Sequence, residues 1–151
     1  MATEPNMIRK FSCFREMTDE QVQLIAKISH SICYPPDHVL FKEGEEGKIL
    51  YLLIQGDVDI FYKTDKTDLN RVDTVSSEEI VGCSAMVPPY KYTATVQTLN
   101  EVEVLEIETQ ELRQLIDQDP HLGMKIQAYM IKILMDRILA LRNRGFTLAI
   151  E

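Results

Sequence analysis

Residues 41–62 read FKEGEEGKILYLLIQGDVDIFY, in which runs of β-branched and aromatic residues alternate with glycine-centred turns. Runs of this composition are typical of short strands. Gly44, Gly47 and Gly56 stand in the turns, where glycine readily takes the positive φ that tight hairpins need. The stretch therefore predicts strands at residues 39–41, 49–54 and 58–62, joined by short turns.

Three more strand-like segments follow, at residues 71–75, 93–96 and 102–107. The last one alternates apolar and acidic residues, which predicts one face in a core and one face in water. Many short strands without long helices between them indicate a jelly-roll or a barrel instead of a doubly wound sheet. We expect this mainly β fold to occupy about residues 34–108 of a single domain that spans residues 1–151.

Helical signals flank the predicted roll on both sides. On the N-terminal side, Thr18 and Gln21 form a capping-box pattern ahead of an amphipathic run. On the C-terminal side, Thr109 is predicted to cap a short helix, and Asp119-Pro120 to begin a long one. Helices are therefore expected over about residues 109–142.

The long C-terminal helix carries too many apolar residues for a single buried stripe. A coiled-coil pattern with 7-3-4-3 spacing runs along it. One face of such a helix can pack on the roll while the seam meets a partner, so we expect a homodimer through this helix or a regulatory protein partner. A single buried helix without a partner is the alternative. The predicted seam consists of Met124, Ile131, Leu134, Ile138 and Leu141.

The chain of 151 residues carries 24 acidic and 16 basic side chains, which gives a formal net charge of −8. This charge disfavours direct binding of nucleic acid, because the phosphate backbone is itself negative. The longest apolar run, residues 49–54, is far shorter than the roughly 20 residues of a membrane span. The N-terminus lacks the pattern of a secretory signal, and we expect a cytoplasmic protein without membrane contact.

Cys13, Cys33 and Cys83 lie 20 and 50 residues apart, and the three histidines are equally dispersed. These spacings match no metal-ligand or redox motif, so free thiols and no metal site are expected. The sequence also lacks a local arrangement of nucleophile, base and orienting group, which argues against an enzyme.

The order of these features resembles the cyclic nucleotide-binding domain family over about residues 11–142. This family supplies the sensor modules of catabolite-activator-type regulators, protein kinase A regulatory subunits and cyclic-nucleotide-gated channels. The segments 41–45 and 50–58 match its glycine-punctuated hairpins, and residues 80–96 match the frame of its phosphate-binding cassette. The resemblance implies an antiparallel β-roll of the jelly-roll type, a double-stranded β-helix, flanked by an N-terminal helix and a long C-terminal helix. It also implies a cassette that captures a cyclic phosphate with backbone N–H groups and one arginine.

Within residues 80–96, the cassette of this chain, the two charged anchors that the resemblance implies are replaced. Cys83 stands where the family has the glutamate that binds the ribose, and Tyr92 where it has the arginine that binds the phosphate. A thiol accepts a hydroxyl proton poorly and a phenol carries no charge. Losing two charge-assisted pairs, at about 1.5–3 kcal/mol each, weakens binding by roughly two to four orders of magnitude. The remaining candidate ligand-binding residues are Gly82, Ser84, Ala85, Lys91, Thr93, Ala94 and Thr95.

Each replaced anchor also has a structural interpretation, Cys83 as a small buried residue and Tyr92 as a packing aromatic. Two functions therefore stay open. One is a regulatory sensor that binds cAMP, cGMP or a related small anion weakly and signals through the C-terminal helix. The other is a degenerate domain that binds no ligand and serves protein–protein interaction or dimerisation. The chain ends at Glu151, so a helix-turn-helix is not expected after the long helix.

Overall fold

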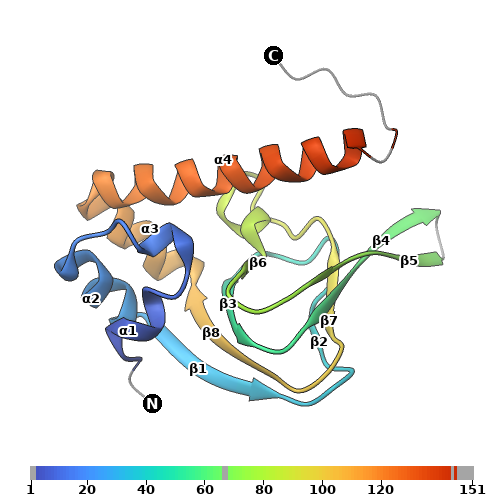
Figure 1. The fold of residues 1–151 in the computed structure, drawn as a ribbon, viewed down its shortest axis with the longest axis horizontal. Helices are drawn as coiled ribbons and strands as arrows, with labels where there is room; N and C mark the ends of the chain where they lie inside the picture. Colours follow the sequence, from blue (N-terminus) through green and yellow to red (C-terminus); the bar gives the residue numbers. More distant parts are fainter. Residues whose placement is uncertain (1–2, 66–67, 144, 146–151) are drawn as a thin grey trace.

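The computed structural model describes residues 3–65, 68–143 and 145, and the side chains of all of these except residues 64–73. Short helices at the N-terminus precede eight strands, and two helices close the described chain (Figure 1). In chain order the elements are α1 (Pro5–Ile8), the 3-10 helix η1 (Ser12–Phe14), α2 (Asp19–Lys27), β1 (Ser29–Tyr34), β2 (Val39–Phe41), β3 (Ile49–Gln55), β4 (Val58–Asp65), β5 (Asp68–Val75), β6 (Ile80–Val81), the 3-10 helix η2 (Cys83–Met86), β7 (Thr95–Thr98), β8 (Val102–Glu108), α3 (Thr109–Gln118) and α4 (Pro120–Asn143).

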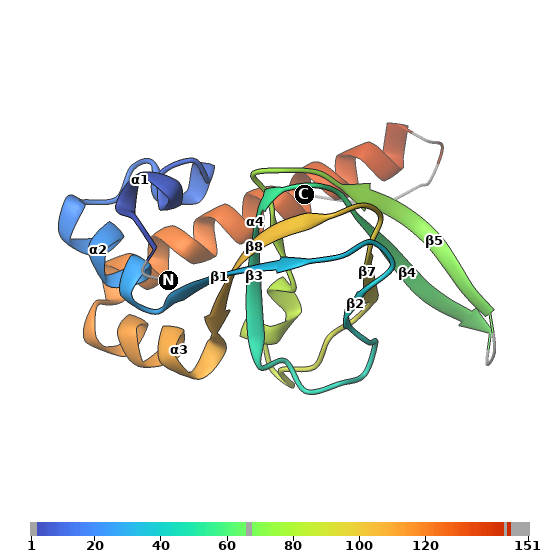
Figure 2. The same ribbon diagram turned by 90° about the horizontal axis from the view of Figure 1, so that it is seen from below.

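The strands form two four-stranded antiparallel sheets, ordered β1-β8-β3-β6 and β2-β7-β4-β5. Strands distant in sequence pair side by side, such as β1 with β8 and β2 with β7. This arrangement confirms the antiparallel β-roll with flanking helices. The β4–β5 hairpin extends beyond the rest of the roll (Figure 2).

Apolar side chains gather in two clusters, one on each side of the first sheet. The roll interior lies between the two sheets and takes Tyr51, Leu53, Val102 and Val104 from the first sheet. The helical cluster lies on the other side, where the N-terminal helices, α3 and α4 cover residues of β3, β6 and β8. Because β3 is covered on both faces, its sequence is a continuous apolar run instead of an alternating one.

The expectation that one face of β8 lies in water is wrong. Val102 and Val104 face the roll interior, while Leu105 and Ile107 belong to the helical cluster. Glu106 shares a face with the two valines, because side chains alternate along a strand, and it is half-buried. The helices cover the face that the sequence pattern had assigned to solvent.

Helix boundaries follow the local capping chemistry. The capping box of α2 is confirmed, since the Gln21 N–H donates to the Thr18 hydroxyl and the Thr18 N–H donates to the Gln21 amide oxygen, each at 3.1 Å. Asp119 accepts from the Leu122 N–H at 3.3 Å, and α4 begins at Pro120 as predicted. Thr109 does not cap α3, because Glu108 holds the N-cap position.

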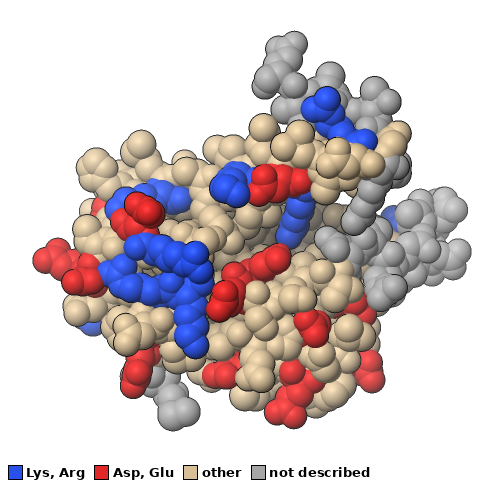
Figure 3. All heavy atoms as spheres, in the orientation of Figure 1, with Lys and Arg blue, Asp and Glu red and all other residues tan. Residues whose placement is uncertain are grey.

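Helix α4 runs along one side of the molecule, over the N-terminal helices at one end and over the roll at the other (Figures 1 and 2). Its first half is anchored by Leu122, Ile126 and Met130, which are buried in the helical cluster. On the face shown in Figure 3, Lys and Arg gather over the N-terminal helices, while Asp and Glu are spread over the roll. None of the helices described here is long and apolar enough to cross a membrane.

Candidate functional site

The cassette begins with a backbone turn that requires glycine. Gly82 has a φ of 90°, in the left-handed region, and precedes η2. The Ala85 N–H donates to the Gly82 carbonyl at 3.0 Å and closes the first turn of this short helix. A Cβ at residue 82 would lie 3.3 Å from Cε1 of Tyr92. Glycine therefore satisfies both the backbone conformation and the close approach of the Tyr92 ring.

Tyr92 points into the roll interior, where it is 5% exposed. Its ring stacks on Phe41 with the ring centroids 3.8 Å apart, and Phe41 stacks on Tyr51 at 5.7 Å. We call these three rings the aromatic stack. The Tyr92 hydroxyl donates to the Ile49 carbonyl at 2.6 Å and accepts from the Ile49 N–H at 3.1 Å. Burial raises the pKa of Tyr92, so the hydroxyl keeps the proton that it donates.

A carboxylate also faces the roll interior. The Tyr34 hydroxyl donates to Glu106, and Tyr34 packs against the apolar cluster of the interior. Burial, followed by this hydrogen bond, raises the pKa of Tyr34. Burial and the negative charge of Glu106 likewise raise the pKa of Tyr51, whose hydroxyl donates to the Leu40 carbonyl at 3.2 Å. The interior is therefore aromatic and carries negative charge, which repels an anionic phosphate.

Other predicted cassette residues lie on different sides of the backbone. Ala85 and Ala94 are buried in the roll interior beside Tyr92. Cys83 instead packs against the helical cluster, where burial raises the pKa of its thiol and Arg137 partly offsets that rise. The structure therefore separates Cys83 from Tyr92 instead of joining them in one binding surface.

Hydrogen bonds between backbone N–H groups and side-chain hydroxyls hold the end of the cassette. The Ser84 hydroxyl accepts from the Thr93 N–H at 3.3 Å, and the buried Thr95 hydroxyl accepts from the Glu43 N–H at 3.0 Å. Lys91 is exposed and forms an isolated backbone bridge with Glu46.

Sequence reasoning missed Arg113 of α3, which contacts the cassette from outside the roll. Its Nη1 donates to the Ala85 carbonyl at 3.3 Å, and its guanidinium carbon lies 4.6 Å from the centroid of the Tyr90 ring. No local pattern indicates this contact, because 28 residues separate Arg113 from Ala85. The inward position of Glu106 did have a signal, since Glu106 shares its strand parity with Val102 and Val104.

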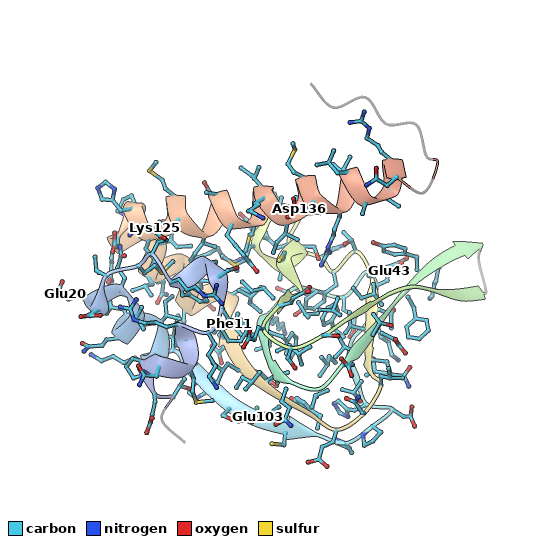
Figure 4. All side chains as sticks on the ribbon, viewed as in Figure 1. Phe11, Glu20, Glu43, Glu103, Lys125 and Asp136 are labelled. Atoms are coloured by element: carbon cyan, nitrogen blue, oxygen red, sulfur yellow. The ribbon has the colours of Figure 1, made fainter. Side chains whose placement is uncertain are left out.

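The helix seam predicted for a partner is largely exposed on α4. Met124 is 66%, Ile131 61% and Leu134 57% exposed. Leu141 is exposed as well, whereas Ile138 is half-buried. Side chains project from the side of α4 that faces away from the roll (Figure 4). Met135 and Leu139 add to this apolar surface.

The family model of the cyclic nucleotide-binding domain matches residues 31–119. The chain belongs to this family of regulatory, signal-transducing domains.

Among solved structures, a putative cyclic nucleotide-binding protein from Geobacter metallireducens superimposes with a TM-score of 0.80 at 30% identity, over 89% of this chain and 98% of that one. The Thermus thermophilus catabolite activator protein shares the fold, with a TM-score of 0.73 at 20% identity, over 88% of this chain and 62% of that one.

Curated relatives include larger proteins. A cGMP-dependent protein kinase of Plasmodium berghei is 27% identical over 143 residues, which are 93% of this chain and 16% of the kinase. A CRP-like cAMP-activated global transcriptional regulator of Mycobacterium tuberculosis is 22% identical over 91% of this chain and 59% of the regulator. The chain thus spans only part of the length of these relatives.

Proposed function

We propose that this chain is a non-catalytic regulatory domain in which Tyr92 fills the place of a cyclic nucleotide, and which acts through protein contacts of α4. The position of Tyr92 carries the proposal. Its ring completes the aromatic stack with Phe41 and Tyr51, and its hydroxyl bonds both backbone groups of Ile49. The cassette is therefore held against the roll by a side chain of the protein itself.

The electrostatics of the roll interior support this proposal. A cyclic phosphate is an anion, and a binding site for it needs positive charge or free N–H donors. Tyr92 supplies neither charge nor a free hydroxyl, and Glu106 adds negative charge nearby. A ligand would have to displace the Tyr92 ring and give up its two hydrogen bonds before it could occupy this space.

A second copy of the chain is the partner that best fits α4. The exposed positions Met124, Ile131 and Leu134 keep the spacing of a coiled-coil seam. An apolar stripe of this kind usually marks an interface. A regulatory protein with an apolar helix of its own is the other partner that this surface could accept.

The net charge and the free thiols indicate which partners and which cell compartment suit this function. The net charge of −8 disfavours a direct role on nucleic acid or on an anionic membrane surface. Cys13, Cys33 and Cys83 form no disulfide, which suits a reducing compartment such as the cytoplasm.

Weak binding of cAMP or cGMP is the second candidate function. The left-handed Gly82 and the short helix η2 favour it, because the backbone frame of the cassette is formed. In this case the ligand would bind without the two charged anchors, and no resident cofactor is implied.

Calorimetric titration separates the two functions. We expect no saturable heat when the wild-type protein is titrated with millimolar cAMP or cGMP. Tyr92→Arg restores the phosphate-binding anchor that the family resemblance implies on the side of the roll interior and should gain affinity for cAMP. A matched control, Tyr62→Arg, adds the same charge at an exposed position and should gain none. Binding by the wild-type protein at micromolar concentration would contradict the proposal.

Sedimentation equilibrium tests the partner. We expect a dimer for the wild-type protein and a monomer for Ile131→Lys, because a charge in the seam opposes its burial. Leu99→Lys is the control, since Leu99 is 48% exposed and lies outside α4. Equal masses for the wild-type protein and Ile131→Lys would argue against a dimer through this helix.

A further inference from the structure

Arg113 lies where three parts of the molecule meet. From α3, its guanidinium reaches the Ala85 carbonyl at the end of η2 and covers the ring of Tyr90 in the following loop. Its Nη2 also donates to the Thr109 hydroxyl at 3.4 Å, one turn earlier on α3. Arg113 is half-buried, so these contacts are partly shielded from water.

Arg113, Thr109, Gly47 of the β2–β3 loop and Tyr90 are joined in a closed circuit of contacts. The Thr109 hydroxyl donates to the Gly47 carbonyl at 2.9 Å, and the Gly47 N–H donates to the Tyr90 carbonyl at 2.7 Å. The aromatic ring of Tyr90 in turn lies under the Arg113 guanidinium, which closes the circuit of contacts. A Cβ at residue 47 would lie 2.5 Å from Cα of Ala85, so the loop and the cassette touch without space between them.

Helix α3 is directly connected to α4 and packs closely against it. A single residue, Asp119, separates the two helices. Gly123 of α4 packs so closely on Ile116 of α3 that a Cβ at residue 123 would lie 2.6 Å from Cγ2 of Ile116. Any displacement of α3 therefore moves the first turns of α4 with it.

We propose that Arg113 is a positioning residue that links the cassette to α3, so that the state of the cassette sets the placement of α4. The inference rests on the proposed function, in which α4 carries the output. It adds the route by which a change at the cassette reaches that helix. The planar guanidinium suits this role, because it can donate to a carbonyl and lie over an aromatic ring at the same time.

The test uses Tyr90, which is 38% exposed, so that its replacement does not remove a core side chain. Tyr90→Phe keeps the ring beneath Arg113, and Tyr90→Leu removes it. Backbone hydrogen exchange is measured across the cassette, α3 and α4 in both variants. For Tyr90→Leu we expect exchange in α3 and the first turns of α4 to speed up about two- to fivefold, the effect of losing an exposed cation–π pair. For Tyr90→Phe we expect wild-type rates.

A second pair of variants addresses the arginine itself. Arg113→Lys keeps the charge but not the planar group, so we expect it to match Tyr90→Leu in α3 and α4. Arg15→Lys is the control, because Arg15 is exposed and its guanidinium bonds the Lys10 carbonyl far from the cassette.

Faster exchange confined to the loop around Tyr90 would overturn the inference, as would equal effects of Tyr90→Phe and Tyr90→Leu. These outcomes are distinct from a failure of the proposed function, which shows in the titration with cAMP and cGMP and leaves the exchange pattern unaffected.

Discussion

Tyr92→Phe removes one oxygen from the roll interior and leaves the aromatic stack in place. The lost hydroxyl bonds the carbonyl and the N–H of Ile49, at 2.6 and 3.1 Å. A buried polar group that loses its partner costs about 1–3 kcal/mol, and both backbone groups of Ile49 are partly shielded from water. We therefore expect Tyr92→Phe to lower the free energy of unfolding by about 2 kcal/mol. For a chain of this size that corresponds to a fall in Tm of roughly 4–8 °C.

Urea unfolding followed by circular dichroism measures this change. Tyr62→Phe is the matched control, because Tyr62 is 41% exposed, and surface substitutions usually stay within about 0.5 kcal/mol of the wild type. Tyr92→Ala also removes the buried ring, and we expect a loss of about 3–5 kcal/mol. If Tyr92→Phe is as stable as Tyr62→Phe, the two hydrogen bonds to Ile49 do not hold the cassette and the reasoning fails.

Two further substitutions test the packing and the acid sensitivity of the fold. Gly47→Ala places a Cβ 2.5 Å from Cα of Ala85 and should cost about 1–3 kcal/mol in urea unfolding; an unchanged midpoint would contradict the close contact. The hydrogen bond from the Gln21 amide is the main cause that lowers the pKa of Asp119 below its ordinary value of 3.8. Its stabilising effect is therefore complete above that value and is lost as the pH falls through the lowered pKa. Asp119→Asn should make stability less dependent on pH in this acid range, and an identical acid profile in urea unfolding would refute the assignment.

Local sequence signals predicted most of the backbone. The strands predicted at residues 39–41, 49–54 and 58–62 form as β2, β3 and β4, and the capping box of Thr18 and Gln21 begins α2 as expected. Residues 80–96, which the resemblance matched to the frame of the cassette, contain the left-handed Gly82 and the short helix η2. These features depend on neighbours in sequence, so a pattern of a few residues is enough to indicate them.

Long-range contacts account for what the sequence did not predict. The Tyr92 hydroxyl bonds a residue 43 positions away, and no spacing rule links such a pair. Arg113 reaches Ala85 across 28 positions from a helix that the cassette motif does not include. Strand β1 was missed because Ser29, His30 and Ser31 give it a polar start that resembles a loop.

The central claim is that the Tyr92 side chain occupies the space of a ligand. Chemical complementation is the most direct test of this claim. Tyr92→Ala should leave a cavity lined by apolar and aromatic groups, and such cavities bind small aromatic molecules. We predict that p-cresol, which reproduces the tyrosine side chain, binds Tyr92→Ala and not the wild-type protein. At about 100 times its Kd it should restore about 2.7 kcal/mol, or roughly 5–10 °C in Tm. No stabilisation of Tyr92→Ala, or equal stabilisation of the wild-type protein, would contradict the account.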